Sequence, residues 1–415
     1  MLTADNAVRE ILSRVNPLAS TEVPILDALG LVLSTGITSP IDFPHWDNSA
    51  MDGYAARSAD LQGTMPVTLT IVEEIAAGAF PTRDIGEGEC ARIFTGAPAP
   101  KGADCVIRQE DTQLVDNRSV RIDNARDAGR NIRRRGEDFT RGTTVLEYGT
   151  TIGPSQLGVL ASLAMATVPV HRKPTVAILA SGNEIADVSE KEEILAGRKI
   201  ASSNTYTLRA LIQQAGATPR NLGIAKDDPA DFHRRLQHAY DADLIITTAG
   251  VSVGEHDYLH QVMDELDLER VFRRLKLRPG APTGFGFIGK LGNKPWLGLP
   301  GNPVSTMVTF ELFGRPAIRR LLGHTKPFRQ TVPVVSGEEI KLGPELRHFL
   351  RVTLSAGDEH PIARLTGAQG SGILTSMAKA DALLVVPEDM PVVKEGEVLH
   401  AIVLDDPRHV EDVPW

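Results

Sequence analysis

The 415-residue chain has only two cysteines, Cys90 and Cys105, and only 5% aromatic residues. Two cysteines cannot form the disulfide framework that small secreted domains need, so we expect a reducing, cytoplasmic setting. Long hydrophobic runs are also missing, because the longest apolar stretch, 157–170, contains serine, threonine and proline and is too short to span a bilayer. The chain starts with a capped helix pattern rather than a basic and then apolar region, which predicts no signal peptide.

The chain also has fewer basic than acidic residues. Lys and Arg total 44 against 53 Asp and Glu, which gives a net charge of −9. This balance argues against a general nucleic-acid binder and favours a soluble protein that handles small molecules. With 42% hydrophobic and 23% charged residues the chain is globular, and its length predicts two to four domains.

The segment Leu244–Tyr258 combines an apolar run with small residues and acids. Residues 244–248 are typical of a buried strand, and Gly250, Ser252 and Gly254 follow it. Small residues at a strand end, next to a helix N-terminus, allow backbone N–H groups to bind an anion. The carboxylates at 255 and 257 would need a cation beside that anion, which indicates an oxyanion held with a hard metal ion. A tight turn with an acidic first helical turn explains these residues equally well.

Acidic residues follow two further apolar strands. Glu184 comes after the strand 176–180, and Asp227 and Asp228 come after a strand near 222–225. Strands alternating with helices predict a parallel sheet covered on both faces, with ligands bound beyond the carboxyl ends of the strands. We therefore expect Glu184, Asp227 and Asp257 to converge on one crevice, with Asp228 as the alternative to Asp227.

A glycine pattern at 284–289 imitates a nucleotide motif, and Lys290 nearly completes a P-loop. Leu291 stands where a P-loop has Ser or Thr, so we interpret the run as two strands joined by a turn at 292–293. The segment LPGNPVS, 299–305, then forms a rigid turn into a helix over 304–322. Asn302 and Ser305 lie at the start of that helix and can receive an anion.

The flanking regions are mostly β in pattern. Residues 65–120 predict a small inserted β domain, and the chain from 326 predicts a small β barrel or sandwich without evident chemistry. Between them lies a basic cluster, which is better explained as a solvated loop of mixed charge than as a phosphate clamp. Its arginines are Arg126, Arg130, Arg133, Arg134 and Arg135.

Six segments in order closely resemble the molybdopterin molybdenumtransferase family, the molybdenum insertases that include gephyrin. The resemblance covers essentially the whole chain, and six ordered motifs are far more specific than one. The segments are DNSAMDGYA (47–55), RIFTGAPAPKGAD (92–104), NIRRRGED (131–138), SGNE (181–184), GVSVGEHDY (250–258) and LPGNPVS (299–305).

The resemblance implies an α/β multidomain protein and an L-shaped homodimer. Its doubly wound parallel-sheet domain would span 174–325 and bind molybdopterin, and an elongated N-terminal domain would comprise 1–48 plus 138–173. An inserted small β domain would span 49–137 and a C-terminal β domain 326–415. The implied reaction inserts molybdate into adenylylated molybdopterin with Mg²⁺ and releases AMP. The adenylylating enzyme and recipient molybdoenzymes would be protein partners.

The resemblance also assigns roles to residues. Those implied to be catalytic are Asp52, Thr95, Asp138, Glu184, Asp227 and Asp257, of which the last three would hold magnesium. Ligand binding would involve Gly250, Ser252, Gly254, Arg278, Pro300, Asn302, Pro303 and Ser305. Asp52 and Thr95 would reach the crevice of the partner subunit. Without the resemblance, Asp52 is explained as a turn residue and Thr95 as a strand-end cap.

Three positions depart from the family pattern, because Ala281, Arg278 and His260 stand where lysines are usual. We hypothesise that ligand affinity or oxyanion choice differs from the usual member while the insertion chemistry remains. His256 and His260 are four residues apart but lack an evident third ligand, so a solvent-facing pair is the better interpretation. The alternatives are a non-catalytic paralogue that binds molybdopterin or the finished cofactor, an interaction scaffold, and a molybdopterin-adenylylating enzyme.

Overall fold

The computed structural model describes residues 1–248, 258–343 and 345–404, without the side chains of 258–260. The chain forms two compact units, each described by itself. One unit comprises Met1–Ser34, Gly149–Gly153 and the chain from Thr167, and the other comprises Thr35–Tyr148 and Pro154–Ala166. The segments 1–48 and 138–173 are thus shared between the two units. In the described residues, no helix has the length and apolarity to cross a membrane.

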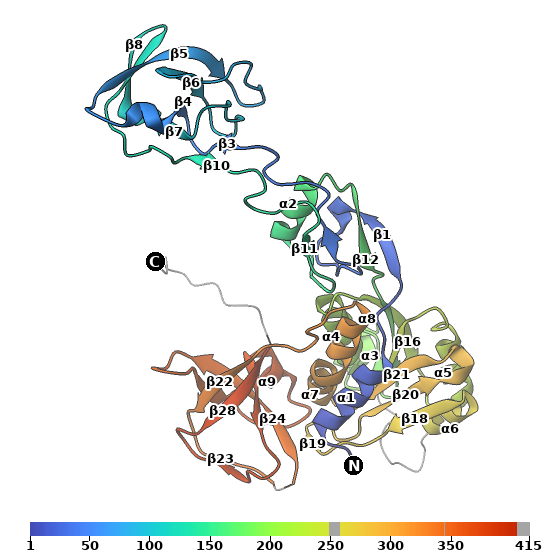
Figure 1. The fold of residues 1–415 in the computed structure, drawn as a ribbon. Coiled ribbons are helices and arrows are strands. Elements are labelled where there is room, and N and C mark those ends of the chain that lie inside the picture. The colour runs from blue at the N-terminus through green and yellow to red at the C-terminus, as the bar shows by residue number, and fades with distance from the viewer. Residues whose placement is uncertain (249–257, 344, 405–415) are drawn as a thin grey trace. The chain divides into compact units, whose positions relative to one another are not determined.

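The first unit is built on a six-stranded sheet of order β16-β13-β17-β21-β20-β18 (Figure 1). Four neighbouring strands are parallel, and two antiparallel strands extend the sheet on one side. The glycine-rich run therefore forms two paired strands, as predicted, and not a nucleotide motif. The strands are β13 (Thr175–Ser181), β16 (Thr218–Ala225), β17 (Leu244–Thr248), β18 (Leu268–Phe272), β20 (Gly284–Ile288) and β21 (Lys294–Leu299).

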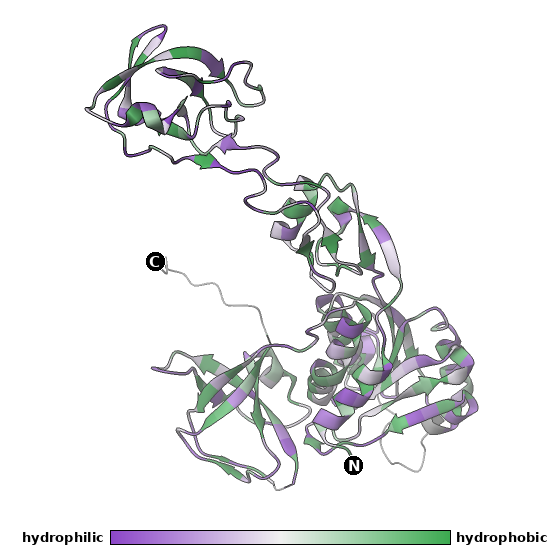
Figure 2. Ribbon diagram, in the orientation of Figure 1, coloured by the Kyte–Doolittle hydropathy of each residue, from purple (hydrophilic) through white to green (hydrophobic). Residues whose placement is uncertain are grey.

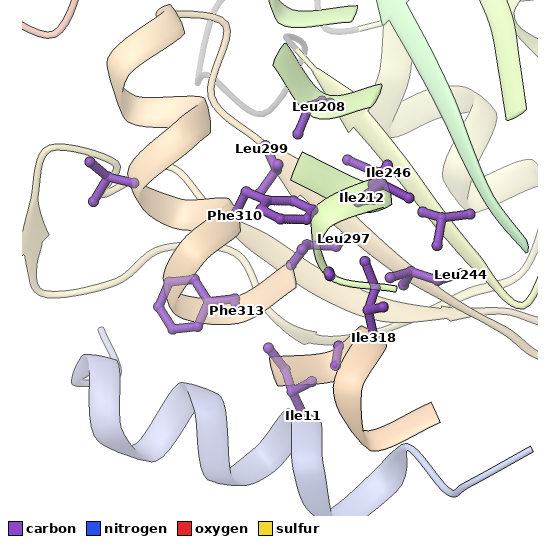
Figure 3. Packing of buried hydrophobic residues seen from close by; sticks show 14 of the residues in the cluster. Ile11, Leu208, Ile212, Leu244, Ile246, Leu297, Leu299, Phe310, Phe313 and Ile318 are labelled. Atoms are coloured by element: carbon purple, nitrogen blue, oxygen red, sulfur yellow. The ribbon is translucent and has the colours of Figure 1, made fainter. Parts of the chain in front are cut away.

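Helices cover both faces of this sheet because successive residues of its buried strands point to opposite sides. Leu244 and Ile246 pack with α1 (Ala4–Arg14), α4 (Ser203–Gln214) and the helical segment from Pro303 (Figure 3). Ile245 faces the other way, toward α5 (Pro229–Gln237) and α6 (Tyr258–Glu265). The predicted doubly wound domain is confirmed.

The helix expected over 304–322 is divided into three parts: α7 (Pro303–Thr309), a π-helical turn (Phe310–Gly314) and α8 (Arg315–Leu321). Pro316 has no N–H with which to bond the carbonyl four residues earlier. The N–H of Arg315 instead donates to the carbonyl of Phe310, five residues back. A Cβ on Gly314 would lie 2.7 Å from the Phe310 ring, so this turn requires glycine there.

The C-terminal region forms a small closed barrel. Its five main strands follow the order β24-β25-β22-β28-β26, and β24 also pairs with β26 to close the ring. A short strand of the α/β domain, β19 (Leu277–Arg278), pairs with β24 in parallel. The barrel strands are β22 (Thr331–Ser336), β24 (Arg347–Ser355), β25 (Ile362–Leu365), β26 (Ala382–Val386) and β28 (Val398–Val403).

The second unit contains another six-stranded sheet, of order β7-β4-β6-β5-β9-β8. Hydrophobic clusters lie on both of its faces, and polar residues are interspersed along its strands (Figure 2). The predicted inserted β domain is therefore present. Its strands are β4 (Gly53–Ala56), β5 (Val67–Ile75), β6 (Glu89–Ile93), β7 (Cys105–Arg108), β8 (Thr112–Asp116) and β9 (Ser119–Ile122).

A charged pair joins β7 to the segment after β9. The carboxylate of Asp127, 2% exposed, accepts two bonds of 2.8 Å from the Arg108 guanidinium and one of 3.2 Å from the Arg108 N–H. The Arg108 side chain thereby lowers the pKa of Asp127 to about 2. A depressed pKa of the folded state means that the stabilisation is complete above pH 3.8 and disappears as pH falls toward 2.

We expect Asp127→Asn to lower the free energy of unfolding by about 2 kcal/mol at pH 7, since one charge-assisted pair is lost. The difference from wild type should shrink below pH 4. Urea denaturation across this pH range measures it. Arg134→Gln is the matched control, because the Arg134–Asp47 pair is 62% and 38% exposed and should change stability by under about 0.5 kcal/mol. A pH-independent difference for Asp127→Asn would contradict the assignment.

Candidate functional site

A cleft of about 570 Å³ opens at the carboxyl ends of β13, β17 and β21. Of the residues singled out from sequence, Glu184, Pro300, Asn302 and Pro303 line it. Ser305 is buried at 4% exposure and is not among its lining residues. The expected position of the ligand crevice, beyond the ends of the parallel strands, is where the cleft lies.

Two helices begin at this cleft. Residues at the start of α4, Ser203 and Asn204, and at the start of α7, Pro303, belong to its lining. The Asn204 amide donates to the carbonyl of Gly301 at 2.7 Å, which joins the two starts. Neither N-cap residue, Ser202 or Asn302, caps its helix through its side chain. The start of α4 therefore offers N–H groups and a positive partial charge to an anion, whereas at the start of α7 Pro303 has no N–H and the Val304 N–H donates to the Ser371 carbonyl.

Glu184 follows Gly182 and Asn183 after the end of β13, and its exposed carboxylate folds back over Gly182. A Cβ added to Gly182 would lie 2.7 Å from both carboxylate oxygens of Glu184. Gly182 also has a φ of +140°, which disfavours other residues. The glycine of the SGNE motif thus leaves space for the carboxylate that follows it.

Asp227 lies at the end of the neighbouring strand β16 and is joined to the SGNE turn by two reciprocal bonds. Its Oδ2 accepts from the Asn183 N–H at 3.1 Å, and its own N–H donates to Asn183 Oδ1 at 3.2 Å. Asp228 has a different task, since its carboxylate accepts the N–H groups of Ala230 and Asp231 as the N-cap of α5. The structure therefore brings Asp227 beside the Glu184 turn and engages Asp228 in capping.

Glu184 and Asp227 supply oxygen ligands of the kind that magnesium prefers, from adjacent strand ends. Among the described residues, no three His, Cys, Asp or Glu side chains gather as a metal site. The expected third ligand, Asp257, lies outside the described residues. So do Gly250, Ser252, Gly254, His256 and the side chain of His260. Two carboxylates at one sheet edge fit a hard divalent cation, and the position of the third stays a prediction.

The segment that departs from the family pattern borders the cleft. Pro282 lines it, and Ala281 precedes Pro282. Arg278 is exposed on β19 and pairs with His348 of β24 rather than lining the cleft. Gly280, with a φ of +109°, packs so closely that a Cβ there would lie 2.2 Å from the Thr309 side chain. A lysine side chain at 281 would therefore start from a rigid turn at the edge of the cleft.

In the second unit, Asp52 and Thr95 form a directly bonded pair. Asp52 Oδ1 accepts both the N–H of Thr95 at 2.8 Å and its hydroxyl at 2.7 Å. These two bonds, the backbone one first, lower the pKa of Asp52 below its usual value. Both residues are exposed. Position 53, directly after Asp52, requires glycine because a Cβ there would lie 1.9 Å from the Ile107 carbonyl oxygen.

Asp138 is exposed, and its N–H donates to the carbonyl of Phe43 at 3.1 Å. The neighbouring basic cluster is largely neutralised, as the mixed-charge interpretation predicted. Arg126 binds Asp111, Arg134 binds Asp47, and Arg135 binds Asp42. These pairs hold the loop instead of leaving three arginines to clamp a phosphate.

The sequence pattern did not identify one buried charged residue near the cleft, Arg351. Arg351 of β24 is fully buried, and in the described residues it binds only neutral groups: its Nε donates to the Ser376 hydroxyl and its Nη2 to the Gly370 carbonyl, both at 3.1 Å. Its Nη1 has no partner in the described part of the chain. Burial lowers the pKa of Arg351 to about 10, so it keeps its charge at neutral pH.

The loop over Arg351 reaches the cleft. Gly372 lines the cleft, and the carbonyl of Ser371 accepts the Val304 N–H at 3.1 Å at the start of α7. A buried cation with a free donor is costly unless an anion compensates it. The sequence indicates this buried cation only through an arginine among the mainly apolar residues of the strand pattern HFLRVTL, 348–354.

Carboxylates, two helix N-termini and a nearby buried arginine define a protein that handles an anionic small molecule in a doubly wound domain. Three family models match: the MoeA N-terminal region (domain I and II) over 2–164, a probable molybdopterin binding domain over 177–320, and the MoeA C-terminal region (domain IV) over 333–404.

Curated relatives and a solved structure agree with these models. A molybdopterin molybdenumtransferase of Nostoc is 35% identical over 399 residues, which cover 94% of this chain and 91% of the relative. Molybdopterin molybdenumtransferase 2 of Mycobacterium tuberculosis is 35% identical over 404 residues, 94% of this chain and 96% of the relative. The crystal structure of a molybdopterin biosynthesis MoeA protein from Pyrococcus horikoshii is 28% identical, with a TM-score of 0.83 over 97% of this chain and 100% of that one. The chain belongs to the molybdopterin molybdenumtransferase family and is an enzyme of molybdenum cofactor biosynthesis.

Proposed function

We propose that the enzyme inserts molybdate into adenylylated molybdopterin in a magnesium-dependent reaction that releases AMP. It would act as a cytoplasmic homodimer, receiving its substrate from the adenylylating enzyme and passing the product to molybdoenzymes. The observation that carries this proposal is that the starts of two helices and Glu184 line one cleft, while Asp227 is bonded to Asn183, the residue before Glu184. Such a site suits two anionic reactants that must be brought together.

Each part of the cleft has a task in this reaction. The N–H groups at the start of α4 would bind phosphate oxygens, and Arg351 would provide positive charge beneath the adjoining loop. Asn204 Oδ1 is buried without a partner among the described residues and offers an acceptor to an N–H of the pterin or adenine ring. Magnesium, when bound by Glu184, Asp227 and Asp257, would offset the repulsion between the anions.

Residues of the second unit would complete the site in the dimer. We propose that the Asp52–Thr95 pair and Asp138 of one chain act at the cleft of the other. The bond from Thr95 orients the Asp52 carboxylate and keeps it ionised, as a group that positions a cation or water must be. Gly250, Ser252 and Gly254 would add backbone donors next to Asp257.

A second candidate function is a non-catalytic protein that binds molybdopterin or the finished cofactor. It is favoured by Ala281, which leaves the edge of the cleft at Pro282 without a lysine. Such a protein would bind the substrate tightly and leave the bond to AMP intact.

The test is AMP release from adenylylated molybdopterin with magnesium and either molybdate or tungstate. We expect oxyanion-dependent AMP release that stops when magnesium is removed with a chelator. Tight binding of the substrate without AMP release would instead support the non-catalytic function. ATP-dependent adenylylation of free molybdopterin would identify an adenylylating enzyme.

A further inference from the structure

The described lining of the cleft contains one carboxylate, Glu184, and neither lysine nor arginine. The substrates of the proposed reaction carry several negative charges, and helix N-termini alone supply only partial positive charge. A side-chain cation for this cleft must therefore come from a neighbouring segment. The segment between β13 and α4 contains a candidate, in an excursion made of β14 (Ile185–Ala186), α3 (Lys191–Leu195) and β15 (Ile200–Ala201).

Lys199 immediately precedes β15, whose Ile200 lines the cleft. The backbone holds this position firmly, because the Ile200 N–H donates to the Glu184 carbonyl at 2.8 Å and β15 pairs with β14. The half-buried Lys199 directs its ammonium at the carbonyl oxygen of Asn183 and donates a hydrogen bond to it. The Lys199 ammonium thus contacts Asn183, the residue between Gly182 and Glu184 whose N–H also donates to Asp227.

The ammonium keeps donors free for a ligand. It carries three N–H bonds and the Asn183 carbonyl accepts one, so two remain. Among the described residues, no carboxylate pairs with it directly. The Glu193 carboxylate accepts bonds of 2.8 Å from Nε and Nη2 of Arg198. Arg198 is the main cause of the lowered pKa of Glu193, and the charge of Lys199 contributes less. A neutral carbonyl positions the lysine without cancelling its charge.

We propose that Lys199 is a substrate-contacting residue of this cleft and donates to a phosphate or oxometallate oxygen of the anionic ligand. The inference rests on the proposed function, because it assigns a cation to the same site. Lys199 provides the full positive charge that the lining lacks, and it lies next to the carboxylates that would bind a divalent cation. It acts mainly on binding, since its contact with a phosphate exists before and after the transfer step.

The test compares wild type with Lys199→Gln and Lys199→Arg in the full-length protein. The control is Arg198→Gln, at a neighbouring cation that Glu193 already binds. Titration calorimetry measures affinity for AMP, the proposed product, and for adenosine, which has the same rings but no charge. We expect Lys199→Gln to weaken AMP binding about 10-fold, from the loss of one charged hydrogen bond. Adenosine binding should be unchanged, and Lys199→Arg and Arg198→Gln should stay within about 3-fold of wild type.

Kinetics provide the second readout: Lys199→Gln should raise KM for adenylylated molybdopterin about 10-fold and leave kcat within about 3-fold. Equal AMP affinity of wild type and Lys199→Gln would overturn the proposal. An equal loss for AMP and adenosine would also overturn it, by showing that the lysine only supports the Asn183 turn. AMP binding needs no turnover, so this result is independent of whether the insertion reaction is the right one.

Discussion

Asp227→Asn is expected to lower kcat/KM for AMP release by at least about 100-fold, since replacing even the second-shell partners of metal ligands costs 10- to 100-fold. The Asn183 turn places the Asp227 carboxylate beside Glu184, and an amide cannot replace its charge toward magnesium. Glu184→Gln should behave similarly. The measurement is AMP release at several magnesium concentrations, and excess magnesium should recover part of the lost rate.

Asp228→Asn is the matched control, because it changes the adjacent residue in the same way. Asp228 caps α5 through two N–H groups, so its loss should cost about 1 kcal/mol of stability at most and leave the rate near wild type. If Asp228→Asn lost the activity and Asp227→Asn kept it, the assignment of the functional acid would be reversed.

The largest expected effect on stability is at Glu311. Its carboxylate, 2% exposed, binds Arg315 at 2.6 Å and Arg329 at 2.7 Å, and those side chains are 7% and 20% exposed. Glu311→Gln leaves two largely buried guanidinium groups without their anion, which should cost about 3–5 kcal/mol of unfolding free energy. Urea denaturation at neutral pH measures the loss.

Arg329 belongs to the connection between α8 and the C-terminal barrel, so Glu311→Gln should also make residues 323–331 easier to cleave by protease. Glu193→Gln is the control, because the Glu193–Arg198 pair is 42% and 60% exposed and should contribute under about 0.5 kcal/mol. If Glu311→Gln lowered the unfolding free energy by less than about 1 kcal/mol, the buried network would not hold the α/β domain and the C-terminal barrel together.

Local patterns predicted much of the fold because the central strands β13 and β17 of the α/β domain are buried along nearly their whole length and end in recognisable turns. The capped helix expected at the start of the chain is α1, with Thr3 as its N-cap. The interpretation of 284–299 as two strands depended on Leu291, which is incompatible with a P-loop, and on the turn residues at 292–293. Placing Glu184 and Asp227 near each other followed from the rule that parallel strands end at the same edge.

Features that depend on distant partners could not be predicted in this way. The π-helical turn at 310–314 arises from Pro316 in a helix that the surrounding core keeps continuous, and a pattern of apolar residues does not reveal it. Arg351 is buried because β24 pairs with β25 and β26 while the loop at 369–373 covers its side chain. The choice between Asp227 and Asp228 required the geometry of the α5 N-terminus, which only the structure provides.

The central claim is that carboxylates from separate strand ends hold a divalent cation where two anions meet. A crystal structure of the enzyme with Mn²⁺ and AMP, with the metal located by anomalous scattering, tests it most directly. We expect a metal peak bonded to oxygens of Glu184 and Asp227 at about 2.0–2.2 Å, with Asp257 as the third ligand and a phosphate oxygen beside it. Clear density for AMP in the cleft, with the metal absent or bound away from both Glu184 and Asp227, would contradict the claim.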